Sequence, residues 1–93
     1  MEKIKFRDFI ALYGDSKKDI ELNCLIGYDG RMVIGNATTT VFDLIEWDYL
    51  VDFEFTNFSE DAENVEDSVN VCVEEMLVYK FMFTNKGLLV WLI

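Results

Sequence analysis

The sequence contains no histidine and no proline, and only two of its 93 residues are cysteine. Without histidine, the chain lacks the side chain that most often serves as a general acid–base or metal ligand near neutral pH. Without proline, no turn depends on a fixed φ angle and no slow prolyl isomerisation is expected. Cys24 and Cys72 are too few and too far apart for a zinc knuckle, so we expect free, buried thiols, with a disulfide as the alternative.

Long hydrophobic runs are also missing from the sequence. The longest, Leu88–Ile93, is far shorter than the ~20 residues that a membrane-spanning helix needs. The first residues, Met1–Lys5, lack the apolar stretch of a signal peptide. The sequence therefore predicts a cytoplasmic protein that makes no membrane contact.

The motifs of common active sites are not found either. Gly27, Gly30 and Gly35 surround an expected hairpin, whereas a phosphate-binding loop needs a strand-to-helix turn. No serine lies in a nucleophile elbow, and the acids do not follow the spacing of a calcium loop. Paired carboxylates such as Asp52 and Glu54 could in principle hydrolyse a glycoside, but a chain this short rarely encloses a sugar cleft. We expect no enzymatic activity, no cofactor and no metal, and a small hydrolase or metal-binding domain is the least favoured interpretation.

What the sequence does contain is enough apolar material for one core. Hydrophobic residues make up 52% of the chain and aromatic residues 15%, and large rings bury much area each. A chain of this length forms one domain, which we expect to span residues 1–93.

Hydrophobic spacing predicts the elements of the first half. Apolar residues three, four and seven apart predict a helix over 5–13, and Gly14 can end it. Alternation over 20–26 predicts a strand, and Asp29-Gly30 suits a tight hairpin turn. The return strand is expected over 31–34, with Gly35-Asn36 closing it.

The middle of the chain predicts a short helix and a strand. Thr40, followed three residues later by Asp43, resembles a capping box for a helix over 41–48. Three residues of this helix are expected to face the core: Val41, Leu44 and Ile45. Alternation over 50–58 predicts a half-buried strand with Asp52, Glu54 and Thr56 on its polar face.

The segment 59–76 allows two interpretations. Ser59 could cap an amphipathic helix, whereas the alternating valines of 69–73 favour a strand. A second hairpin is expected from 77–83 and 88–93, which flank a glycine-containing turn. The predicted fold class is α+β: a small single domain with a largely antiparallel β-sheet, an N-terminal helix and one or two further short helices.

Charge is distributed unevenly along the chain. No lysine or arginine occurs between Met32 and Tyr79, and this span holds twelve of the eighteen acids. Because burying an unpaired carboxylate costs several kcal/mol, these acids should form a negative surface in water. The residues expected to bind a partner are Asp52, Glu54, Glu60, Asp61, Glu63, Glu66, Asp67, Glu74 and Glu75.

Two explanations of this charge remain open. The acids can simply be a solvated face that keeps the protein soluble. Alternatively, spaced carboxylates can imitate the phosphates of a nucleic acid and occupy a basic nucleic-acid-binding surface on another protein. The same negative field opposes direct binding of this chain to DNA or RNA.

The opening residues 3–13, KIKFRDFIALY, resemble the start of short proteins encoded by phages and prophages of Gram-positive bacteria. In those proteins a similar helix precedes strands, a short helix and a C-terminal strand. The resemblance covers about the first half of the chain, and the acidic stretch 59–75 departs from it as an insertion. The chain is also similar to anti-CRISPR proteins in size, charge and lack of catalytic motifs. This resemblance implies a phage-type inhibitor, acting in the host-cell cytoplasm, that blocks a nucleic-acid-binding surface of a host defence protein such as a Cas effector. The resemblance assigns no function to any individual residue.

The alternative function is structural. The C-terminal hairpin carries Tyr79, Phe81, Phe83 and Trp91, and an exposed apolar strand there would promote self-association. In this interpretation the chain is a structural or assembly protein that self-associates through this hairpin as a homodimer.

Overall fold

A computed structural model describes residues 3–13, 18–57 and 65–93 of the chain. It confirms the α+β class, with two helices and a six-stranded sheet in the order β4-β3-β2-β1-β6-β5. Neighbouring strands are antiparallel except β1 and β6, which run parallel. The elements are α1 (Phe6–Tyr13), β1 (Asp19–Tyr28), β2 (Arg31–Thr39), α2 (Val41–Glu46), β3 (Leu50–Asn57), β4 (Val65–Cys72), β5 (Val78–Thr84) and β6 (Gly87–Leu92).

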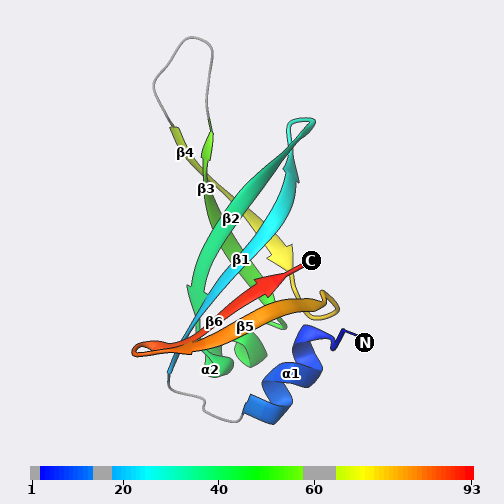
Figure 1. Cartoon of the computed structure of the whole chain (residues 1–93). Coiled ribbons are helices and arrows are strands. Elements are labelled where there is room, and N and C mark those ends of the chain that lie inside the picture. The colour runs from blue at the N-terminus through cyan, green and yellow to red at the C-terminus, as the bar shows by residue number, and fades with distance from the viewer. Residues whose placement is uncertain (1–2, 14–17, 58–64) are drawn as a thin grey trace.

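The two helices lie on the same side of the sheet (Figure 1). Phe6 and Ile10 of α1 and Leu44 of α2 are almost fully buried against inward side chains of the strands, among them Phe53 and Val90. We call this side of the sheet the covered face. No helix in the described part of the chain is long and apolar enough to cross a membrane.

The opposite side of the sheet has no described helix over it, and we call it the open face. Strand side chains alternate between the two faces, so the pairing register identifies which residues lie there. The open-face side chains are those of Asp19, Glu21, Asn23, Leu25, Met32, Ile34, Asn36, Thr38, Leu50, Asp52, Glu54, Thr56, Glu66, Ser68, Asn70, Cys72, Lys80, Met82, Thr84, Leu89 and Trp91.

The first helix and first hairpin are confirmed, but the return strand is longer than expected. Asp29 and Gly30 adopt positive φ angles of 50° and 74°, as a tight hairpin turn requires. β2 then continues to Thr39, and Gly35-Asn36, expected to close the strand, lies inside it. Gly35 is opposite Cys24 in β1, and it leaves room for side chains of the covered face. Glycine is needed at this position because neighbouring side chains pack closely against the strand, and not because the chain turns there.

The second helix is confirmed with two corrections. Thr40 caps it, because its Oγ1 accepts a hydrogen bond of 3.1 Å from the backbone N–H of Asp43. The helix ends at Glu46, earlier than the expected residue 48. Ile45 is 63% exposed, so its expected core position is wrong. In so short a helix only Val41 and Leu44, three residues apart, face the sheet.

Of the uncertain segment 59–76, residues 65–72 form a strand and residues 73–76 lie in the turn that follows it. β4 pairs with β3 along its whole length, which excludes the helical alternative for 65–72. Ser59, the proposed cap, lies outside the described residues. The C-terminal hairpin is confirmed as β5 and β6. Both cysteines are free; Cys24 is buried as expected, but Cys72 is exposed, because it ends the edge strand β4.

Replacing Gly35 by alanine tests the packing inside β2. The new Cβ would lie 2.3 Å from Cδ1 of Ile26 and 3.1 Å from Cβ of Phe53. We expect a loss of about 1–3 kcal/mol in the free energy of unfolding, measured by urea denaturation. The matched control is Gly27→Ala, where the nearest atom is Sδ of Met32 at 3.9 Å. That change should be neutral or stabilise by up to about 1 kcal/mol, and equal stability of the two variants would contradict the packing argument.

Candidate acidic binding surface

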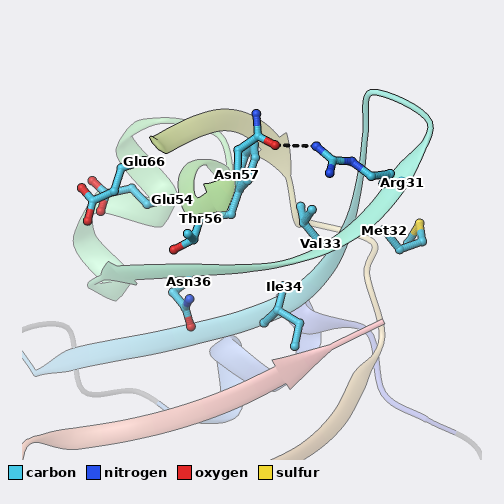
Figure 2. Close-up of a pocket in the computed structure, with 10 residues that line it drawn as sticks. Arg31, Met32, Val33, Ile34, Asn36, Glu54, Thr56, Asn57 and Glu66 are labelled. Atoms are coloured by element: carbon cyan, nitrogen blue, oxygen red, sulfur yellow. Dashed lines mark hydrogen bonds between the residues drawn. The ribbon is translucent and has the colours of Figure 1, made fainter. Parts of the chain in front are cut away.

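Three of the expected partner-binding acids come together on the open face. Asp52 and Glu54 alternate with buried residues of β3, so both point away from the helices. Glu66 of β4 lies opposite Thr56, one step along the sheet from Glu54. Figure 2 shows Glu54 and Glu66 extending side by side in the same direction. The alternation of β3 predicted this orientation, whereas the position of Glu66 depends on the β3–β4 register.

Glu21 of β1 is a fourth acid on this surface and was not expected there. It lies opposite Thr38, and together with Asp52 and Glu54 it lines a shallow hollow of about 390 Å³. Glu21 lies before the span without lysine or arginine, so the charge pattern along the sequence did not identify it as part of the surface. The alternation of β1, in which Glu21 is exposed between the buried Ile20 and Leu22, was the signal that could have found it. We call Glu21, Asp52, Glu54 and Glu66 the acidic surface.

Neutral polar side chains lie directly opposite Glu54 on both neighbouring strands. Asn36 lies opposite Glu54 on one side, and Ser68 lies opposite it on the other. Asp52 and Glu54, two residues apart on β3, are about 7 Å apart, whereas Glu54 and Glu66 are diagonal neighbours across the β3–β4 pair. Among the described residues, no ion pair reaches the acidic surface. The charge of this surface is therefore not neutralised from within the described part of the molecule.

Glu74 and Glu75 have a different environment. Lys5 lies 3.6 Å from a carboxylate oxygen of Glu75, and Arg7 lies 3.5 Å from Glu74 and 3.9 Å from Glu75. The backbone N–H of Arg7 also donates to the carbonyl of Glu74, which holds the start of α1 against this turn. The expectation that these acids lack a nearby cation is wrong for this pair, because the fold brings the N-terminal bases to them.

Asp67 lies on the covered-face side of β4, opposite Phe55. It accepts a hydrogen bond of 2.5 Å from the hydroxyl of Tyr28 and one of 2.9 Å from the backbone N–H of Ser68. The Tyr28 hydrogen bond lowers the pKa of Asp67, and the Ser68 bond lowers it further. The same bond to Asp67 raises the pKa of Tyr28. Asp67 therefore links the β1–β2 hairpin to β4 and does not point outward with Glu66.

Glu60, Asp61 and Glu63, the other three acids expected to bind a partner, lie outside the described residues.

A cleft adjoins the acidic surface where the sheet opens. β2 and β3 are in register at Asn36 and Glu54, and the two hairpins diverge beyond that pair (Figure 1). The resulting hollow of about 520 Å³ is lined by residues of β2, β3 and β4, including Ile34, Phe55 and Glu66. Arg31 donates a hydrogen bond to the side-chain oxygen of Asn57 across its end (Figure 2). Side-chain bonds thus connect the hairpins where the backbone ladder stops.

The described residues contain no group of three or more cysteine, aspartate and glutamate side chains placed to hold a metal ion. What the arrangement offers chemically is a set of fixed negative charges beside a cleft with both polar and apolar walls. The chain matches no protein-family model, no curated protein and no solved structure.

Replacing Tyr28 by phenylalanine tests the bond to Asp67. We expect the pKa of Asp67 to rise toward its usual value of 3.8, measured by carboxyl NMR titration. Because the folded-state pKa is lowered, this group stabilises the folded protein above about pH 4, and the contribution is lost as pH falls through the lowered pKa. The stability difference between wild type and Tyr28→Phe should therefore shrink below pH 4. As a control, Asp52→Asn should leave the Asp67 titration unchanged; an unshifted Asp67 in Tyr28→Phe would refute the assignment.

Proposed function

We propose that this protein is a non-catalytic inhibitor of the phage type. It binds the basic nucleic-acid-binding surface of a host defence protein, such as a Cas effector, and keeps nucleic acid out. The observation that carries the proposal is the acidic surface: four spaced carboxylates on one uncovered sheet face, with no described cation paired to them.

The geometry of these charges suits imitation of a phosphate backbone. Asp52 and Glu54 follow each other along β3, and Glu21 lies two strands away at about 10 Å, since neighbouring strands are about 4.8 Å apart. A protein that binds nucleic acid through lysine and arginine gains affinity by releasing counterions from phosphates. Spaced carboxylates offer such a protein charges of the same sign for its lysines and arginines to contact, and this attraction also weakens with salt. The net charge of −10 also speeds its encounter with a basic partner.

The rigidity of the sheet favours binding. Val51, Phe53 and Phe55 are buried beneath the acids of β3, so the backbone that carries the charges is fixed before a partner arrives. Preorganisation reduces the entropy lost on association.

Apolar residues on the same face favour a protein partner over a purely solubilising role. Leu25, Met32 and Ile34 are 56%, 64% and 53% exposed, and they lie on the β1–β2 hairpin beside the acids. Charge contributes mainly to association rate and specificity, whereas apolar contact contributes to the lifetime of a complex. A face that serves only solubility has no need of such a patch.

Neutralising three acids tests the proposal. The variant Asp52→Asn/Glu54→Gln/Glu66→Gln keeps the shape of each side chain and removes three charges. We expect association with the captured partner to slow by about tenfold or more, and the dependence of affinity on salt to become shallower. The experiment captures partners from host lysate at low and high salt, and then adds duplex DNA to displace them. Inhibition of DNA binding by a purified Cas effector gives a second measurement.

The matched control removes the same number of charges elsewhere. Asp43, Glu46 and Asp48 are exposed and lie on or just after α2, on the covered-face side. Asparagine tolerates the positive φ angle of 52° at position 48. The control Asp43→Asn/Glu46→Gln/Asp48→Asn should bind nearly as wild type does. The proposal fails if both variants lose binding equally, or if the captured partner is not displaced by DNA.

A further inference from the structure

The outer side of β5 is an open sheet edge. β5 pairs with β6 on one side, and the N-terminal segment covers only the beginning of its other side. There the backbone N–H of Val78 donates to the carbonyl of Ile4 at 2.9 Å, and Lys3 lies over the ring of Tyr79 at 4.7 Å. From Lys80 to Thr84, no residue in the described part of the chain pairs with the outer backbone.

This edge is apolar, unlike the opposite edge of the sheet. Phe81, Met82 and Phe83 are 50%, 57% and 68% exposed. α1 reaches two of these rings: Phe9 lies 4.8 Å from Phe81, between ring centroids, and Tyr13 lies 6.2 Å from Phe83. β4, at the other edge, carries Glu66 and Asp67, and charged side chains are a common protection of exposed edges. β5 carries one charged side chain, Lys80, at the beginning of the unpaired stretch, and none from Phe81 to Thr84.

Charge allows a second copy to approach here. Residues 76–93 contain no acid and two lysines, although the chain as a whole carries −10. Two copies therefore repel each other least where their β5 edges meet. A β4–β4 contact would bring the acids of both copies together.

We infer that the open edge of β5 pairs with β5 of a second copy of this chain, antiparallel, around a two-fold axis at Met82. A two-fold pairing that continues the sheet must set open face beside open face, so one residue lies opposite itself. With Met82 at the axis, the pairing spans Lys80–Thr84 and sets each Phe81 opposite Phe83 of the other copy. Each Lys80 then lies opposite Thr84 of the other copy, so no two like charges are directly opposite each other.

The neighbouring two-fold register, with Phe81 at the axis, fits less well. In that register Tyr79 would have to pair with Phe83 of the other copy. Tyr79 lies where the β5–β6 register shifts, and Lys3 already lies over its ring. In the pairing at Met82, the acidic surfaces lie toward the outer ends of the dimer, because β3 and β4 are at the far side of each sheet. The dimer therefore does not depend on the function proposed above.

A charge-swap experiment at the axis tests this pairing. Wild type should dimerise in sedimentation velocity, and more strongly at high salt, because salt screens the repulsion between two acidic chains. Met82→Lys and Met82→Glu each set two like charges opposite each other, and each should weaken dimerisation by about tenfold or more. An equimolar mixture of the two variants should recover a dimer, since lysine then faces glutamate.

The control is Met32→Lys, which changes a methionine of similar exposure, 64% against 57% for Met82, in the β1–β2 hairpin. It should dimerise as wild type does, and circular dichroism should show all variants folded. A monomeric wild type would overturn the inference, as would a dimer that both Met82 variants retain. A mixture that fails to recover the dimer would overturn the two-fold axis at Met82. Open-ended assemblies would show head-to-tail pairing of β5 with β4 instead.

Discussion

The structure depends on the alternation of β3. Val51, Phe53 and Phe55 fill the covered face, and this alone directs Asp52 and Glu54 to the open face. A slip of one residue in register would bury the carboxylates and expose the rings. Since an unpaired buried carboxylate costs several kcal/mol, the wrong register is strongly disfavoured. The same constraint that builds the core therefore creates the acidic surface.

Local patterns predicted the elements and their faces, but not their neighbours. The α+β class, the β1–β2 hairpin and the outward direction of Asp52 and Glu54 all follow from periodicities of two and 3.6 residues. Glu21 joined the acidic surface only because β2, which pairs with β1, also lies beside β3. Strand order is a property of tertiary packing, and no pattern within one strand contains it.

Dependence on tertiary packing also explains why some of the acids expected to bind a partner do not lie on the acidic surface. A count of charge along the chain treats residues 43–75 as one negative block, whereas the fold divides them. Arg7 reaches Glu74 across 67 positions of sequence, a contact that depends on how α1 docks. Asp67 differs from Glu66 by a single position and so lies on the other face, within reach of Tyr28. Distance along the sequence therefore predicts neither which charged residues are close in space nor which face of the sheet a side chain occupies.

Strand order also separates the charges across the sheet. β3 and β4 lie at one side and carry acids, while β5 and β6 lie at the other and carry none. An edge strand exposes unpaired backbone groups, and charge on its side chains decides whether another strand can add there. At β4, Glu66 and Asp67 oppose such addition. In a chain with a net charge of −10, the absence of acids from β5 and β6 leaves the β5 edge as the side of the sheet where repulsion between two copies is weakest.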